Sequence, residues 1–177
     1  LTTDANAEVR QQAAFALGQL RDEGAVQALG AAVRDKDAEV RQQAVFALGQ
    51  LRAASAVPAL TAAVQDADAD VRQQAVFALG QIRAEGAVAP LLGALKDAQP
   101  DVREQAAFAL GQIGSREAVP ALIAALKDAA ADVRQQAAFA LGQVGDGRAS
   151  EPLAAALKDG DVDVRKQAAF ALGQLEN

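Results

Sequence analysis

The sequence predicts an all-α fold, a right-handed alpha solenoid of tandem two-helix repeats with a 31-residue period. The segment Val-Arg-x-Gln-Ala-(Ala/Val)-Phe-Ala-Leu-Gly-Gln occurs six times, with its Val at Val9, Val40, Val71, Val102, Val133 and Val164. Consecutive copies are always 31 residues apart, and no insertion interrupts them. A fixed period of this size is typical of an array in which each repeat buries its apolar face against its neighbours.

The first helix of each repeat carries the Val-Arg segment. In residues 9–20 the apolar side chains recur at helical spacing and predict one buried arc, formed by Val9, Ala13, Ala16, Leu17 and Leu20. At about 100° per residue, Phe15 falls on the other side of this helix, away from the arc. Asp-rich stretches precede these helices, for example around Asp37, and we expect them to cap the free N–H groups.

The second helix of each repeat follows a short polar turn. In the fourth repeat the turn spans residues 114–117, and the apolar pattern resumes over residues 118–127. Proline is tolerated in the first turn of a helix, which is where we place Pro58, Pro90, Pro120 and Pro152. We therefore expect residues 1–177 to form a single solenoid with six Val-Arg helices and five second helices, as a segment of a longer array.

Two further residue types predict details of the helices. An interior glycine costs a helix about 1 kcal/mol relative to alanine, so the repeated glycine, as at Gly49, predicts a close approach of neighbouring helices. Gly114 and Gly145 stand where helices are expected to end in a left-handed residue. The equivalent residues Arg21, Arg52 and Arg83 are then expected to adopt the same strained backbone.

The composition argues against catalysis and against several kinds of partner. The chain contains no His and no Cys, which removes the usual zinc, iron and thiol sites, so we predict no enzyme activity, no metal and no cofactor. Ser55, Ser115 and Ser150 have no histidine base. The formal net charge is -6, with no basic stripe, which disfavours nucleic acid and anionic membranes. No apolar run reaches the roughly 20 residues of a membrane span, so we expect a soluble protein, with the cytoplasm slightly favoured.

The repeated motifs resemble a known family. The combination of Val-Arg, Ala-Leu-Gly and Ala-Val-x-x-Leu in a two-helix unit is similar to the HEAT-like repeats of the phycobilin-lyase type, over essentially the whole chain. It also resembles artificial alpha-repeat scaffolds built from the consensus of that family. This resemblance implies that the Val-Arg helices line a concave face and carry the binding positions. A hydroxylase related to this fold would need His and Glu metal ligands, and the chain has no His.

An aspartate and an arginine recur six residues apart in every repeat, as in Asp4 and Arg10. Six identical copies suit a structural role better than a single catalytic site. The resemblance implies bonds within and between neighbouring repeats, which we call the structural ladder. Its central residues are Asp35, Arg41, Asp66, Arg72, Asp97, Arg103, Asp128 and Arg134.

One phenylalanine per repeat forms the most informative pattern for function. We predict a Phe stripe made of Phe15, Phe46, Phe77, Phe108, Phe139 and Phe170. Glutamines border it at Gln11, Gln42, Gln73, Gln135, Gln19, Gln50, Gln81, Gln112 and Gln143. Two interpretations stay open: the rings form a contact surface, or each ring packs between neighbouring Val-Arg helices.

The sequence therefore predicts a non-catalytic scaffold for protein interaction or assembly, which binds a protein or peptide partner on the concave Phe and Gln face. Self-association through the repeat ends or the Phe stripe is part of this prediction. Two alternatives remain at this stage. One is a subunit of a bilin lyase or of a chaperone that handles a cofactor, and the other is a designed repeat scaffold without a biological role.

Overall fold

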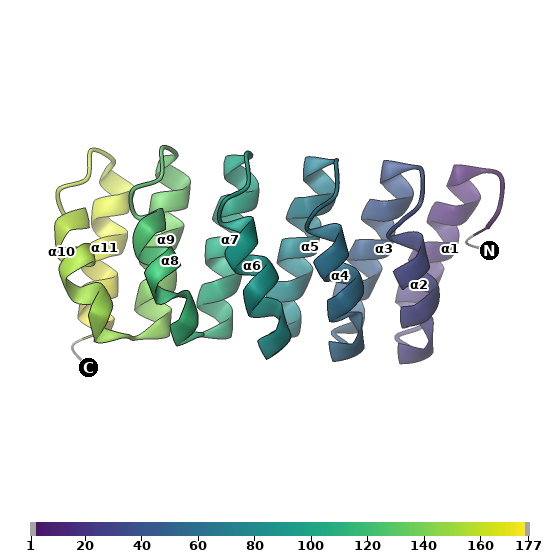
Figure 1. Ribbon diagram of the computed structural model, residues 1–177, viewed down its shortest axis with the longest axis horizontal. Coiled ribbons are helices and arrows are strands. Elements are labelled where there is room, and N and C mark those ends of the chain that lie inside the picture. The colour runs from purple at the N-terminus through teal and green to yellow at the C-terminus, as the bar shows by residue number, and fades with distance from the viewer. Residues whose placement is uncertain (1–2, 176–177) are drawn as a thin grey trace. The chain divides into compact units, whose positions relative to one another are not determined.

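The computed structural model describes residues 3–175. Over this range the chain forms eleven α-helices and five short 3-10 helices, with no strand (Figure 1). The contacts between Cα atoms divide the chain into two compact units, Leu1–Ala87 and Val88–Asn177, here the N-terminal and C-terminal units. The all-α prediction is confirmed, and the single-domain organisation over residues 1–177 stays a prediction.

In each unit, long helices of the Val-Arg segment alternate with short second helices. The helices of the N-terminal unit are α1 (Ala7–Gln19), α2 (Val26–Ala32), α3 (Ala38–Leu51), α4 (Val57–Ala63) and α5 (Ala69–Ile82). The 3-10 helices η1 (Glu23–Ala25), η2 (Ala54–Ala56) and η3 (Glu85–Ala87) follow the long helices. Figure 1 shows α2 and α4 as one layer in front of α1, α3 and α5.

The C-terminal unit has the same alternation. Its helices are α6 (Val88–Ala94), α7 (Pro100–Ile113), α8 (Val119–Ala125), α9 (Ala131–Val144), α10 (Ser150–Ala156) and α11 (Val162–Leu175). The 3-10 helices η4 (Arg116–Ala118) and η5 (Gly147–Ala149) connect long helices to short ones. Long helices pack side by side, α7 on α9 and α9 on α11, while α8 packs on α9 and α10 on α11.

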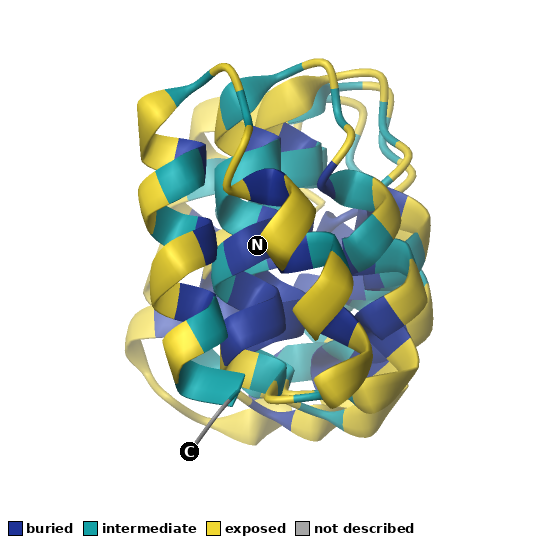
Figure 2. Ribbon diagram, turned by 90° about the vertical axis from the view of Figure 1, so that its left-hand side faces the viewer, coloured by how far each residue is buried: buried dark blue, intermediate teal, exposed yellow. Residues whose placement is uncertain are grey.

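The core of each unit lies between the two helix layers, where Figure 2 shows the buried residues. In α3 the expected arc is buried at Val40, Ala44, Ala47 and Leu48, and Val45 is buried as well. In α1 the expected arc is partly wrong, because Val9 is 39 % and Leu20 is 69 % exposed. The reason is packing: α3 contacts long helices on both sides, α1 and α5, whereas α3 is the one long helix that α1 packs against within the described residues.

The repeated helix glycine stands where two long helices approach each other closely, as the sequence predicts. A Cβ added to Gly49 would lie 2.9 Å from Cβ of Ala78 on the next long helix. At Gly111 the added Cβ would lie 2.8 Å from Cα of Ala140. Real Cβ atoms do not approach other heavy atoms this closely, so only glycine permits this spacing of the helices. The same residue thus weakens its own helix and sets the contact between repeats.

The ends of the long helices also follow the sequence. Arg21, Arg52 and Arg83 have φ values of 51°, 50° and 53°, in the left-handed region that favours glycine. Gly114 and Gly145 occupy the equivalent positions in the C-terminal unit, with φ values of 72° and 66°. At the start of α3, the Asp37 carboxylate accepts hydrogen bonds from the N–H groups of residues 39 and 40.

Candidate binding surface

The Phe and Gln residues singled out in the sequence lie on the solvent side of the long helices. Phe15, Phe46 and Phe170 are 45 %, 38 % and 57 % exposed. Phe77, Phe108 and Phe139 are partly buried, and none of the fifteen residues is fully buried. The rings therefore pack in part against neighbouring helices and still reach solvent. We call this surface the long-helix face.

Two of these rings contact each other in the C-terminal unit. The ring centroids of Phe108 and Phe139 lie 6.3 Å apart, and the ring planes differ by 18°. This distance is within the range of about 4.5–7 Å for interacting aromatic pairs. The contact links one ring on α7 to one on α9, so the two helices present a continuous aromatic area.

Carboxylates accompany this aromatic pair. Asp101, Glu104 and Phe108 are three and seven residues apart on α7 and therefore share one side of the helix. Burial, followed by the negative charges of Asp132 and Asp101, raises the pKa of Glu104 above its ordinary value. Glu104 stands where the other long helices carry Gln, or Lys in α11. Glu104 was not among the binding residues predicted from the sequence, where it is visible as a departure from the repeated Gln.

The ladder lies at the start of the long helices: its aspartates are in the loops that precede these helices, and its arginines are in the first turn of the helices. In the ion pairs described, the Arg of one repeat holds the Asp of the next repeat, 25 residues later, through Nε and Nη2. The distances from Nε to Oδ2 are 2.7 Å for Arg10–Asp35, 2.7 Å for Arg41–Asp66, 2.8 Å for Arg103–Asp128 and 2.8 Å for Arg134–Asp159. Each pair is bidentate, which fixes the orientation of the two groups.

The Asp six residues before each of these arginines contributes its backbone carbonyl and not its carboxylate. Nη1 of Arg103 donates to the carbonyl of Asp97 at 2.9 Å, and Nη1 of Arg72 donates to the carbonyl of Asp66 at 2.9 Å. The Asp97 carboxylate accepts the N–H of Gln99. Each arginine thus joins the loop before its own helix to the loop of the following repeat.

The ion pairs change the titration of the aspartates. The hydrogen bond from Arg103 lowers the pKa of Asp128 below its ordinary value, against the opposing effect of burial. For Asp66, burial acts to raise the pKa, but the hydrogen bonds from Arg41 and from the N–H of Asp68 outweigh it. The Asp66 pKa is therefore also lowered. These carboxylates are held ionised at neutral pH, which suits a structural charge pair.

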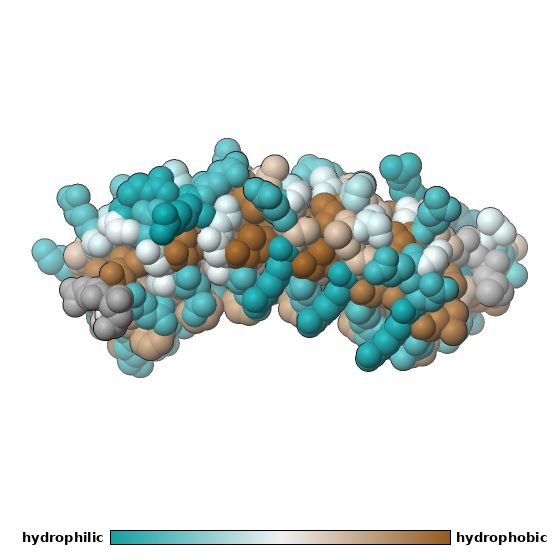
Figure 3. Space-filling view, turned by 90° about the horizontal axis from the view of Figure 1, so that it is seen from below, coloured by the Kyte–Doolittle hydropathy of each residue, from teal (hydrophilic) through white to brown (hydrophobic). Residues whose placement is uncertain are grey.

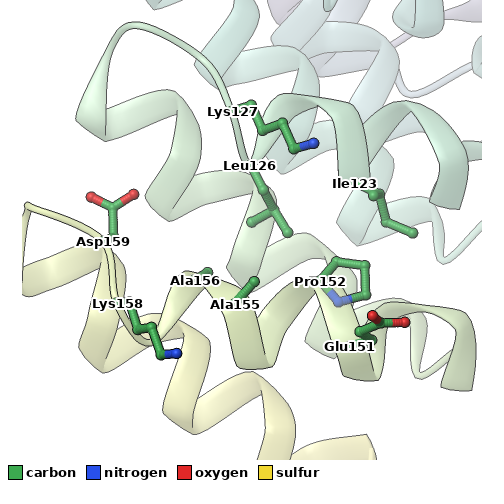
Figure 4. Close-up of a pocket in the computed structure, with 9 residues that line it drawn as sticks. All are labelled: Ile123, Leu126, Lys127, Glu151, Pro152, Ala155, Ala156, Lys158 and Asp159. Carbon is green, nitrogen blue, oxygen red and sulfur yellow. The ribbon is translucent and has the colours of Figure 1, made fainter.

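A hollow of about 390 Å³ opens on the short helices of the C-terminal unit. Figure 4 shows Ile123 and Leu126 on one side and Pro152 with two alanines on the other, while Lys127, Lys158 and Glu151 stand at the rim. The sequence did not predict it, because the helix position of Ile123 carries different residues in the other repeats. Its rim carries both positive and negative side chains, so its charge favours no one class of partner.

Three further observations concern possible metal sites, membrane spans and surface hydropathy. Among residues 3–175, no group of three or more acidic, His or Cys side chains is arranged to hold a metal ion. In the same range, no helix has both the length and the apolar character needed to cross a membrane. On the side shown in Figure 3, hydrophobic residues form small groups between hydrophilic ones.

Comparisons with known proteins agree with this architecture. The HEAT repeat family matches residues 1–73, 61–136 and 119–177, which together span the chain. No functionally curated protein sequence matches significantly.

Several solved structures share the fold. The complex of CpcE and CpcF of phycocyanin lyase from Nostoc sp. PCC7120 matches with 27% identity and a TM-score of 0.71, over 99% of this chain and 74% of that one. YibA of Escherichia coli matches with 27% identity and a TM-score of 0.73, over 97% and 67% of the two chains. An engineered protein matches with 24% identity and a TM-score of 0.73, over 99% and 96%, which shows the fold alone.

Proposed function

Because the chain belongs to the HEAT repeat family, we propose that it is a non-catalytic scaffold that binds a protein or peptide partner on its long-helix face. The observation that carries this proposal is the exposure of the phenylalanines. A large apolar side chain gains about 1.5–3 kcal/mol from full burial, so these partly exposed rings, and above all Phe15, Phe46 and Phe170, forgo part of this stabilisation. A bound partner that covers the rings would recover it.

The surroundings of the rings support the same proposal. Glutamine side chains such as Gln112 and Gln81 stay accessible beside the rings and offer hydrogen-bond donors and acceptors without charge. Aromatic residues with a polar surround are typical of interface centres, where a few anchors provide most of the binding free energy. The face repeats along the long helices of each unit, which suits an extended partner segment.

The test is a selection from a random peptide library on the immobilised chain. The selected peptides are then measured by fluorescence anisotropy against a triple variant, Phe46→Gln, Phe77→Gln and Phe108→Gln. We expect at least a tenfold loss of affinity with nearly unchanged helicity, because these rings are anchors on the surface. A matched triple variant away from this face, Lys36→Gln, Lys127→Gln and Lys158→Gln, controls for the number of substitutions.

Equal binding to both triple variants would show that the selected peptides use another surface. Failure to enrich any peptide over a blank support would count against the binding role as a whole. Early melting of the Phe variant would instead assign the rings to the core, in which case truncation costs about 3–5 kcal/mol per ring.

A further inference from the structure

We propose that the long-helix face of the C-terminal unit binds arginine side chains of an extended basic peptide, with Phe108, Phe139 and Glu104 as the centre of the site. Asp101 and Asp132 flank this centre. The inference rests on the proposed function and names the class of partner for one part of the surface. We call these five residues the arginine site.

The helical spacing brings the acidic and aromatic groups of α7 together. Glu104 lies one turn before Phe108, and Asp101 lies nearly one turn before Glu104, so the three side chains follow one line along the helix. Phe139 on α9 extends the aromatic area through its contact with Phe108. Asp132 stands on α9 at the position that Asp101 has on α7.

The carboxylates of the arginine site lack a compensating cation. Within residues 3–175, the Glu104 side chain forms no ion pair and no hydrogen bond, and its charged neighbours are Asp132 and Asp101. The nearest repeated arginines in sequence, Arg103 and Arg134, are held by Asp128 and Asp159 in the ladder. A cationic ligand would therefore relieve repulsion among three like charges.

The helix α11 shows the opposite arrangement and marks one limit of the site. Lys166 stands at the position of Glu104, and its Nζ lies 3.0 Å from Oδ1 of Asp163 in the first turn of α11. This acid is thus neutralised within its own helix. Among the described long helices, only α7 carries an acid at both of these positions, Asp101 and Glu104, and Asp132 on α9 adds a third carboxylate.

The aromatic pair favours arginine over lysine. A guanidinium group is planar, stacks on aromatic rings and forms bidentate bonds to a carboxylate, whereas an ammonium group offers a point charge. In an extended peptide, side chains two residues apart are separated by about 6.6–6.8 Å. This spacing is close to the 6.3 Å between the two ring centroids, so an Arg-x-Arg segment matches the pair.

The probe is the capped peptide Gly-Ser-Arg-Ser-Arg-Ser-Gly with an amino-terminal fluorophore, measured by anisotropy against the full 177-residue chain at about 0.15 M salt, where the Debye length is about 8 Å. We expect Glu104→Gln to weaken binding about tenfold, which corresponds to about 1.4 kcal/mol. Gln is the residue at this position in four other long helices, so the variant should fold normally. Phe108→Leu keeps an apolar side chain without the aromatic ring, and we expect a loss of about fivefold, in line with a cation–π contact.

The matched control is Glu39→Gln in the N-terminal unit, which makes the same charge change on the long helix α3. We expect it to alter affinity by less than about twofold, because screening weakens distant charges. Two control peptides test the spacing and the side chain. One has the same composition with its two arginines adjacent, and the other has lysines in place of the arginines. Both should bind more weakly.

Equal losses for Glu104→Gln and Glu39→Gln would overturn the inference, because attraction would then follow net charge alone. Unchanged binding by Phe108→Leu would also overturn it. If the basic probe fails to bind while peptides selected from the library bind the long-helix face, the arginine site is wrong and the proposed function stands. If neither binds, both proposals fail.

Discussion

The two units use the same repeat but secure the ends of their long helices differently. In the N-terminal unit, α3 and α5 begin with the side-chain caps Asp37 and Asp68 and end at left-handed arginines. In the C-terminal unit, the N-cap residues of α7 and α9 are Gln99 and Ala130, and their side chains form no capping hydrogen bond. These two helices end at Gly114 and Gly145, where the left-handed backbone is unstrained.

The buried residues differ in a compensating way. The N-terminal unit has Val45 and Val76 on long helices, where the C-terminal unit has Ala107 and Ala138. The residue that directly follows the short helix before each of them changes in the opposite direction, from Val33 and Val64 to Leu95 and Leu126. Both units contain the same two contacts between repeats. One is the close approach of a glycine of one long helix to an alanine of the next, which we call the Gly–Ala approach, and the other is the Arg–Asp ion pair. The repeat fold thus depends on contacts between repeats and tolerates different helix ends.

The largest expected effect concerns the shared Gly–Ala approach. Gly111→Ala places a Cβ 2.8 Å from the backbone of residue 140, and we expect a loss of about 2–3 kcal/mol from overpacking. Gly49→Ala meets the Cβ of Ala78 at 2.9 Å and should destabilise the N-terminal unit in the same way. Urea unfolding of both variants measures the free energy of unfolding.

Gly93→Ala is the matched control, because an added Cβ there meets no atom within 4 Å. We expect it to stabilise the chain by about 0.5–1 kcal/mol, since alanine favours the helical state. If Gly111→Ala were as stable as the original chain, the close approach of α7 and α9 would not require glycine at residue 111. The Gly–Ala approach would then not explain the repeated glycine.

The second prediction concerns the shared Arg–Asp pairs. Asp128→Asn and Asp66→Asn each remove a bidentate ion pair whose side chains are only 10–15 % exposed. We expect losses of about 1–2 kcal/mol at pH 7, after allowing for solvent screening. The lowered pKa of each aspartate means that its contribution is present above the ordinary carboxyl pKa and is lost as the pH falls through the folded-state pKa.

Urea unfolding at pH 7 and at pH 3 checks the sign. The destabilisation caused by each Asn variant should shrink in acid, because the same carboxyl groups become protonated in the unfolded original chain first and their contribution to stability declines. A loss that is independent of pH would assign these residues a packing role without a charge contribution. A loss in one unit alone would break the equivalence of the two sets of pairs.

The repeat made the fold predictable from the sequence. A residue type that recurs every 31 positions occupies one structural environment, so the helical arc, the Gly approach and the left-handed Arg52 follow from a single repeat. The prediction of the buried arc was less accurate for a helix whose neighbouring long helices differ from those of the other repeats. Val9 is exposed and Val40 is buried, because only the second has long helices on both sides.

The candidate surface was less predictable, because it depends on departures from the repeat. The helical projection placed the phenylalanines on the solvent side but gave no measure of how far each ring packs on its neighbour. Glu104 is a single exception among the repeats, and its effect arises from carboxylates on two helices. The individual partners of the ladder arginines also required the structure, because the resemblance implied bonds within and between repeats without naming atoms. The structure shows, for example, that Arg103 binds the carboxylate of Asp128, 25 residues later, and the backbone carbonyl of Asp97.

The third prediction tests the differing helix ends. Arg52→Gly should stabilise the N-terminal unit by about 1 kcal/mol, because a left-handed backbone is costly for a residue with a Cβ. The hydrogen bond from Arg52 to Gln81 that is lost is long, at 3.5 Å, and exposed. The reciprocal change Gly114→Arg should destabilise the C-terminal unit by a similar amount. Thermal unfolding of the two variants measures the two shifts in melting temperature. Shifts in the same direction would contradict the interpretation that a left-handed helix end favours glycine.

The smallest expected effect concerns the missing side-chain caps of α7 and α9. Ala130→Asp introduces at the start of α9 the residue that Asp68 provides at the start of α5, and we expect a gain of about 0.5–1 kcal/mol in the free energy of unfolding. Ala130→Asn keeps the hydrogen-bond acceptor without the charge, so it separates capping from the repulsion by Asp128 and Asp132. A gain for Asn and none for Asp would show that the acidic surroundings of α9 cancel the cap. No gain for either variant would mean that the cap has little effect where neighbouring repeats already hold the helix.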